Sequence, residues 1–367
     1  MIRTTKRRIA IITLIVSAVS AIACTSALIG RDTARHGRML LWKHRDSGVQ
    51  HSFVERVAPT DSTLAYVALF NAGDTLLREA WIGFNSAGFA IMNTASYNLA
   101  PDTAQIRDRE GLVMAEALSR CHSVADFTAL LDSAMHRGPL GVQANFGTFD
   151  STGNGAYIEC TDHEYRIFPL NEDPNQALIR TNYSVSGGDT NRLGEVRYRN
   201  AAYLLHSPIA RNDVSPELFT DTLSRSFFDA SVGFDRSAKG VSKIADKGEM
   251  IPRRTSTASV VIEGSLPGEN AAETMVMWVS LGFPPASHVE AVTLDSVPEI
   301  LRPTGPNVEA PMSRTAFERR ERTFQQKNNA GKWLFDLNYL TPLSESERQQ
   351  SLETYERERK RRHGNNK

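Results

Sequence analysis

The sequence lacks the motifs on which most metal, nucleotide and disulfide chemistry depends. Its 367 residues include only three cysteines, too few for a disulfide scaffold. It has no His-Glu-x-x-His motif and no pair of Cys-x-x-Cys motifs, so a zinc site has no support. A Gly-x-x-x-x-Gly-Lys loop, a Gly-x-Gly-x-x-Gly turn after a strand and a Gly-x-Ser-x-Gly elbow are missing as well. We therefore expect no cofactor and no metal site.

The chain also has no excess of either charge. The 42 lysines and arginines balance the 42 aspartates and glutamates, so net charge gives no reason to expect a nucleic acid or an anionic surface as partner. A basic run at residues 357–362 has no aromatic residues interleaved with it, unlike a surface that binds single strands. We expect no nucleic-acid partner and interpret this run as a solvated helix with a frayed end.

One long apolar run is present, at the start of the chain. Lys6-Arg7-Arg8 precedes a stretch, residues 9–22, that is apolar apart from one threonine and two serines. Ala21-x-Ala23 has the small residues that a signal peptidase requires, and the run is shorter than the roughly 20 residues that span a bilayer. We predict a signal peptide at residues 1–23 and an exported protein, periplasmic or secreted.

A cut after Ala23 makes Cys24 the first residue of the mature chain. A cysteine in this place also suits a bacterial lipoprotein, in which it carries a lipid anchor. Lipoprotein sites favour leucine three residues before the cysteine, where this chain has Ala21. The ordinary cut is therefore favoured, and contact with a membrane is expected only if Cys24 is lipidated.

A terminal cysteine combines a nucleophile and a base in one residue. An α-amino group has a pKa of about 7.7–8.0, so a sizeable neutral fraction exists near neutral pH and can take the thiol proton. The thiolate can then attack a carbonyl, provided that an oxyanion hole is present. Cys121 and Cys160 have no such setting; they could pair with each other in an oxidising compartment or serve as small buried hydrophobic residues.

The mature chain alternates groups of strands with groups of helices. Sequential strands joined by tight turns indicate antiparallel sheets, and the irregular crossovers argue against repeated βαβ units. We predict an α+β protein of two face-to-face sheets with helices outside, forming one catalytic domain at 24–312 and a charged helical extension at 313–367. The expected strands are 25–30, 39–46, 52–57, 65–70, 76–84, 89–92, 144–149, 156–159, 165–170, 177–181, 257–263, 274–281 and 289–294. The expected helices are 109–120, 123–137 with a capping box at Ser123 and Asp126, 195–206, 216–228, 314–326 and 344–362.

Several stretches, in order, resemble one family. Cys24-Thr25-Ser26-x-Leu28-Ile29, followed by a turn and residues 41–48, resembles the start of the N-terminal-nucleophile (Ntn) amidohydrolases. The similarity is to the choloylglycine hydrolase and penicillin acyltransferase (peptidase C45-like) group, and it extends over residues 24 to about 295. The other similar stretches are residues 83–94, 144–146, 180–183, 194–201, 259–262 and 278–284.

The resemblance implies a four-layer αββα sandwich and a set of site residues. Cys24 would be the nucleophile and, through its amine, the base. Asp46 would hold or polarise that amine, and Asn93 would donate to the oxyanion. Asn182 would complete the oxyanion hole or bind the amine, and Arg197 would orient the nucleophile region or the substrate.

One short stretch departs from the family pattern. The group often shows Arg-Asn-x-Asp where this chain has Lys43-His44-Arg45-Asp46. Lys43 takes the place of that arginine, while Arg45 could replace it, so the assignment of the substrate-binding cation stays open between the two.

The resemblance implies an exported cysteine Ntn hydrolase that cleaves a linear amide through a thioester, with water or an amine as acceptor. Its partner would be a small-molecule amide. One alternative is a dipeptidase of the related C69 type, which also begins Cys-Thr. The other is a non-catalytic lipoprotein on the same fold, anchored through Cys24. The sequence leaves the substrate and the oligomeric state open.

Overall fold

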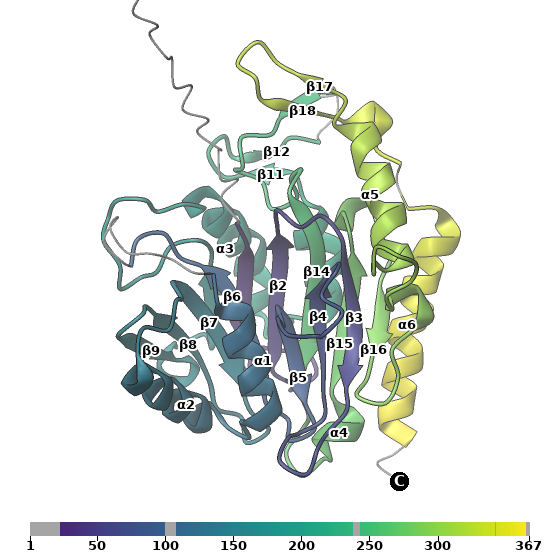
Figure 1. The fold of residues 1–367 in the computed structure, drawn as a ribbon. Coiled ribbons are helices and arrows are strands. Elements are labelled where there is room, and N and C mark those ends of the chain that lie inside the picture. Colours follow the sequence, from purple (N-terminus) through teal and green to yellow (C-terminus); the bar gives the residue numbers. More distant parts are fainter. Residues whose placement is uncertain (1–22, 100–107, 238–242, 342, 365–367) are drawn as a thin grey trace, which may run out of the picture.

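A computed structural model describes residues 23–99, 108–237, 243–341 and 343–364. The predicted signal peptide lies outside these ranges except for Ala23. Over the ranges described, no helix is both long and apolar enough to cross a membrane. Two large antiparallel sheets dominate the structure (Figure 1).

The six-stranded sheet carries the start of the mature chain. Its strand order is β10-β1-β2-β14-β15-β16, and every neighbouring pair is antiparallel. Cys24 directly precedes β1, which lies between β10 and β2, so two strands far apart in sequence flank it. The strands are β1 (Thr25–Ile29), β2 (Leu40–Asp46), β10 (Ala177–Arg180), β14 (Ser256–Glu263), β15 (Val276–Leu281) and β16 (Glu290–Val292).

The seven-stranded sheet is a meander in chain order, as the sequential strands and tight turns predicted. One expected strand is shorter than predicted: the strand begins only at Ile82, and Leu77, in the part predicted to be extended, has a φ of 53°. The strands are β3 (Ser52–Val57), β4 (Tyr66–Asn71), β5 (Ile82–Asn85), β6 (Ala90–Ala95), β7 (Ala144–Phe149), β8 (Gly155–Cys160) and β9 (Tyr165–Pro169).

Helices cover the outer face of each sheet. Helices α1 (Glu110–Arg120) and α2 (Val124–Arg137) lie against the seven-stranded sheet, and Ser123 with Asp126 forms the predicted capping box of α2. Helices α3 (Glu195–Ala210) and α6 (Glu345–Gly364) cover the six-stranded sheet. The four layers are therefore helix, sheet, sheet and helix, which confirms the predicted αββα fold class.

Two hydrophobic cores follow from this layering. Leu28 and Leu41 of one sheet meet Met92 of the other in the larger core, which continues beneath α1 and α2. On the opposite face of the six-stranded sheet, Trp42 stacks on Phe219 with ring centroids 4.9 Å apart. Because side chains alternate along a strand, the neighbours of Trp42 in β2 point between the two sheets.

The C-terminal segment packs against the domain. Tyr355 of α6 contacts Trp278 at 4.5 Å between ring centroids, and Arg362 forms a buried ion pair with Glu263 at 2.9 Å. The expectation of a solvated helix was therefore wrong for the face of α6 that carries Tyr355 and Arg362, because these side chains cover the sheet, and the expected frayed end lies partly outside the described residues.

Shorter elements complete the described fold. The expected helix at 216–228 is a π-turn at Leu218–Thr222 followed by a 3-10 turn at Leu223–Arg225. Further 3-10 turns span Leu170–Glu172, Pro284–Ala286, Glu299–Leu301 and Leu337–Tyr339. The remaining elements are β11 (Phe228–Asp229), β12 (Phe234–Asp235), β13 (Lys243–Ala245), α4 (Ala271–Thr274), α5 (Pro311–Thr323), β17 (Gln326–Lys327) and β18 (Trp333–Asp336).

Candidate active site

The main chain of Cys24 is held from both sides by residues far away in the sequence. Its backbone N–H donates to Asn182 Oδ1 at 2.8 Å. Arg197 donates from Nη1 to the Cys24 carbonyl at 2.5 Å and to Thr25 Oγ1 at 3.1 Å. Arg197 Nη2 also donates to Asn182 Oδ1 at 2.8 Å, so the three residues form a closed set of contacts. Three of the predicted site residues are thus brought together.

The local structure explains how Asn182 and Arg197 reach Cys24. Asn182 follows β10, which pairs with β1, and its amide nitrogen donates to the Ala95 carbonyl at 2.9 Å. Arg197 lies in the first turn of α3, after Gly194, whose φ of 88° favours glycine. A Cβ on Gly194 would lie 2.3 Å from Arg197 Nη2, so the glycine also leaves room for the guanidinium.

Asp46 ends β2 and is completely buried beside Cys24. Its Oδ2 accepts from Arg253 Nε at 2.9 Å and its Oδ1 accepts from Ser256 Oγ at 2.7 Å. Its main-chain carbonyl lies 3.8 Å from Cys24 Sγ. Burial raises the pKa of the Asp46 carboxyl, and the positive charges of Arg253 and Arg197 oppose that rise. The main chain of Asp46 therefore contacts the Cys24 thiol, while both oxygens of its carboxylate are held by residues 253 and 256.

Lys43 and Asn93 lie together between the sheets. Lys43 Nζ donates to Asn93 Oδ1 at 2.7 Å and to the Trp81 carbonyl at 2.8 Å. Complete burial lowers the pKa of Lys43 to about 8, while a negative charge on Cys24 would raise it. Because Lys43 binds the amide oxygen of Asn93, the NH₂ group of Asn93 is directed away from the cation, as an oxyanion donor requires.

Arg45, the second predicted substrate-binding cation, is held by the protein itself. It donates to Ser52 Oγ and Thr257 Oγ1 at 3.2 Å each and to Asn71 Oδ1 at 2.6 Å. Its guanidinium also lies 5.1 Å from the centre of the Trp81 ring, and burial lowers its pKa to about 10. Lys43 and Arg45 are therefore buried cations with intramolecular partners, and a negative charge on Cys24 would raise the pKa of each.

Sequence reasoning missed Arg253 and Ser256, which hold both carboxylate oxygens of Asp46. Arg253 lies 207 residues from Asp46, in a loop with no periodic pattern and no motif. The only local indication is Pro252, which marks a turn. His44, to which the sequence assigned no catalytic role, contacts Ser256 Oγ at 2.8 Å, and burial lowers its pKa to about 3.

The other two cysteines have a different setting. Both are free and buried, so the structure holds no bond between Cys121 and Cys160. Burial raises the pKa of Cys121 to about 12 and the pKa of Cys160 further. Across the part of the chain that the structure describes, no three histidine, cysteine, aspartate or glutamate side chains gather so as to hold a metal ion.

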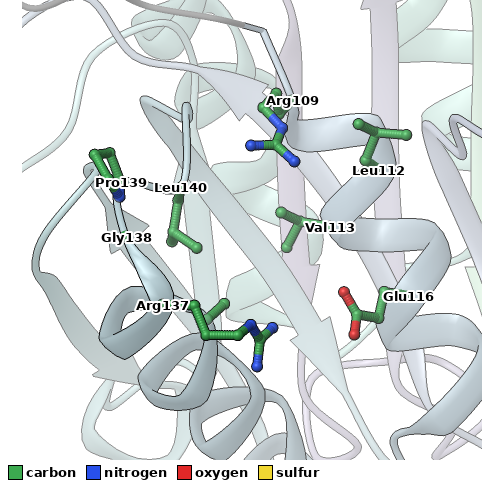
Figure 2. Close-up of a pocket in the computed structure, with 9 residues that line it drawn as sticks. Arg109, Leu112, Val113, Glu116, Arg137, Gly138, Pro139 and Leu140 are labelled. Atoms are coloured by element: carbon green, nitrogen blue, oxygen red, sulfur yellow. The ribbon is translucent and has the colours of Figure 1, made fainter.

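A surface hollow between α1 and α2 is separate from this site (Figure 2). It has a volume of about 280 Å³, and the side chains of Arg109 and Arg137 point into it from opposite ends. None of the residues that bind Cys24 or Asp46 lines this hollow. The residues that the sequence predicts for the site therefore lie outside this hollow.

Comparison with known proteins gives likenesses in structure only. No family model matches the chain, and no curated protein matches it. An ortholog of N-acylethanolamine-hydrolyzing acid amidase from Caenorhabditis elegans is 14% identical with a TM-score of 0.46, covering 67% of this chain and 94% of that chain. A variant of conjugated bile acid hydrolase from Clostridium perfringens is 11% identical with a TM-score of 0.44, covering 75% and 94%.

Penicillin V acylase from Agrobacterium tumefaciens is 12% identical with a TM-score of 0.37, covering 75% of this chain and 87% of that chain. These three proteins are Ntn hydrolases of the choloylglycine hydrolase group, the group that the sequence motifs resemble. At TM-scores below 0.5, the likenesses carry no conclusion about the activity of this chain.

Proposed function

We propose that this protein is an exported cysteine amidohydrolase in which Cys24, freed by a cut after Ala23, is the N-terminal nucleophile. Its substrate is a small linear amide, and the acyl group passes through a thioester to water or to an amine. The observation that carries the proposal is that Asn182 and Arg197, which bond to each other, both form hydrogen bonds to the main chain of Cys24. A residue that only joins an export signal to a domain does not need hydrogen bonds from two buried side chains to its main chain.

The geometry supports a definite sequence of proton transfers. Once the chain begins at Cys24, its nitrogen is an amine that Asn182 Oδ1 holds at the position of the present N–H. The amine takes the thiol proton, and the thiolate attacks the amide carbon. Asn93 donates to the oxyanion, the Cys24 ammonium returns its proton to the leaving nitrogen, and a thioester remains. Water or a second amine then attacks the thioester and releases Cys24.

Three buried cations interact electrostatically with Cys24. A negative charge on Cys24 interacts favourably with Lys43, Arg45 and Arg197, and it opposes the loss of their protons on burial. Three cations around one thiol are the kind of setting in which a cysteine becomes reactive.

The burial of Cys24 argues against the lipoprotein alternative. The residue is 3% exposed, and its Sγ lies 3.8 Å from the main-chain carbonyl of Asp46. A diacylglycerol group on this sulfur would have to displace packed side chains, whereas a small acyl group needs much less room. The C69-type dipeptidase alternative shares the nucleophile and differs only in substrate.

Two measurements test the proposal. N-terminal sequencing and intact mass of protein from a bacterial host that exports it are expected to show a free amine on Cys24. A blocked and diacylated Cys24 would contradict the enzyme. A panel of N-acyl amino acids, bile-acid amides, penicillins and dipeptides then identifies the substrate class, with Cys24→Ser as the control. Turnover of dipeptides alone would favour the dipeptidase.

A further inference from the structure

We propose that Arg253 is a positioning residue for Asp46 and that the C-terminal segment, acting through Arg254, keeps Arg253 in place. This deepens the proposed function and rests on it, since Asp46 matters as the carboxylate beside Cys24. The inference concerns residues 243–256, α5 and β18, none of which belongs to the sequence motifs that indicated the site.

The guanidinium of Arg253 contacts Ala23, which precedes the proposed cleavage point, and Asp46, which follows it. Arg253 Nε donates to Asp46 Oδ2 at 2.9 Å, and Arg253 Nη2 donates to the carbonyl of Ala23 at 3.5 Å. The Asp46 side chain is fully buried and that of Arg253 is 11% exposed, so solvent screens the pair only weakly. Arg253 is therefore placed to control both the charge and the direction of the Asp46 carboxylate.

The same tight turn supplies the second donor to Asp46. Ser256 N donates to the Arg253 carbonyl at 3.0 Å, and Arg253 N donates to Ser256 Oγ at 3.0 Å. Ser256 Oγ in turn lies 2.7 Å from Asp46 Oδ1. Both carboxylate oxygens are thus bound by residues of one turn, so a shift of that turn moves both contacts together.

The C-terminal segment holds this turn through Arg254. The Arg254 guanidinium pairs with Glu321 of α5 at 3.0 Å and lies 4.4 Å from the centre of the Trp333 ring in β18. Its backbone N–H donates to Asp246 Oδ2 at 2.8 Å, and Asp246 N donates to the Trp333 carbonyl at 2.8 Å. Figure 1 shows β17 and β18 at the end of the sandwich where β2 finishes, which is the end that carries Asp46.

The other groups that face Asp46 determine how its pKa should respond to the loss of Arg253. Arg197 of α3 adds a second positive charge, and Cys24 lies beside the Asp46 carbonyl. His44, which shares Ser256 with Asp46, is neutral because burial lowers its pKa to about 3. Loss of Arg253 therefore leaves Arg197 to oppose the desolvation of Asp46, and the pKa of Asp46 rises.

The test measures the pKa of Asp46 itself. Three variants make the same change: Arg253→Met removes the direct contact, Arg254→Met removes the support, and Arg322→Met alters an exposed arginine of α5. In each mature protein the Asp46 carboxyl is titrated by ¹³C NMR, with Asp46→Asn to assign the resonance. The rate of Cys24 alkylation by iodoacetamide is recorded over the same pH range.

We expect Arg253→Met to raise the pKa of Asp46 by about one unit or more, as removal of an adjacent opposite charge does. Arg254→Met raises it by a smaller amount, and Arg322→Met leaves it unchanged. An unchanged Asp46 in Arg253→Met, or an Arg254→Met that behaves like Arg322→Met, overturns the inference. If Arg254→Met does not fold, Glu321→Gln is compared in the same way with Glu318→Gln at an exposed position of α5.

Different measurements test the positioning role of Arg253 and the proposed function of Cys24. The NMR titration needs no turnover, so it decides the positioning role alone. An alkylation rate at Cys24 no higher than at the two buried cysteines would contradict the proposed function, whatever the pKa of Asp46 does.

Discussion

Cys24 and Cys160 are both buried thiols of the same sandwich, with 3% and 0% of their surfaces exposed. Their electrostatic surroundings are opposite. The charges that interact with Cys24 include Lys43, Arg45 and Arg197. Cys160 interacts with the carboxylates of Glu110 and Asp162, which add to the effect of burial and raise its pKa.

The comparison teaches that two equally buried thiols of one fold can differ in the sign of the charges near them, and the proposed function assigns the reactive role to the thiol with cations nearby. β2 places Lys43 and Arg45 on the side of the sheet that faces the other sheet, and α3 adds Arg197 from the opposite side. No cation is among the groups that shift the pKa of Cys160 within the described chain. Changes to Cys24, or to the groups that surround it, should therefore affect activity far more than changes at Cys160.

The largest effect is expected from the nucleophile. Cys24→Ser should lower kcat/KM by at least about 10³-fold, because a hydroxyl is a far weaker nucleophile than a thiolate near neutral pH. Cys160→Ser is the matched control and should keep kcat/KM within a few-fold of the wild type. Steady-state kinetics on the best amide of the panel make the measurement. Equal losses in the two variants would refute the distinction between the thiols.

An uncut chain should be almost as inactive. Ala23→Pro blocks signal cleavage and leaves the nitrogen of Cys24 as an amide, which cannot accept the thiol proton. We expect no turnover above that of Cys24→Ser, although the same contacts to Asn182 and Arg197 can form. Mass spectrometry confirms that the chain is uncut. Full activity of the intact chain would show that the amine is not the base.

Gly194 offers a way to disturb Cys24 without altering a charge. Gly194→Ala places a Cβ 2.3 Å from Arg197 Nη2 at a residue with φ of 88°, which costs about 1–3 kcal/mol in strain. We expect kcat to fall about 10- to 100-fold and the melting temperature to drop by several degrees. Gly188→Ala, where an added Cβ would approach only Thr190 Oγ1 at an ordinary contact distance of 4.0 Å, should change neither quantity.

The smallest effect concerns Lys43. Lys43→Met should slow alkylation of Cys24 about tenfold at pH 7, because one nearby positive charge no longer favours the thiolate. The pKa of Lys43 is about 8, so its charge is present below that pH and is lost as pH rises through it. The ratio of wild-type to variant rates should therefore shrink above pH 8. Lys360→Met, at an exposed lysine of α6, should give wild-type rates at every pH.

The sequence was a good guide to the part of the site that contacts Cys24. Cys24 directly follows the predicted signal peptide, and Asn182 and Arg197 fall within stretches that resemble a family. The structure places both against Cys24. The sequential strands joined by tight turns also predicted antiparallel sheets, and the order of strands and helices predicted two of them packed face to face.

The rest of the site could not be predicted from local pattern. Arg253 reaches Asp46 across 207 residues, and its contact depends on how a loop folds against β14. Arg45 looked like a substrate-binding cation, yet the structure surrounds it with Ser52, Asn71 and Thr257. Such contacts depend on tertiary packing, to which neither periodicity nor composition is sensitive.

The charged C-terminal helix is another element whose packing could not be predicted from its sequence pattern. Its sequence has almost no apolar stripe, so it indicated a solvated helix. In the structure, Tyr355 and Arg362 pack on Trp278 of the six-stranded sheet. Long arginine stems can cover apolar surface while their charge finds a partner, here Glu263.

The most direct test of the central claim is to identify the atom that takes up an acyl group. Mature protein is mixed with an activated acyl ester, quenched in acid and mapped by mass spectrometry. The account predicts one acyl group per chain, bound as a thioester to Cys24 and absent from Cys121, Cys160 and the uncut chain. Equal acylation after Cys24→Ser, or labelling of the buried cysteines at the same rate, would contradict it.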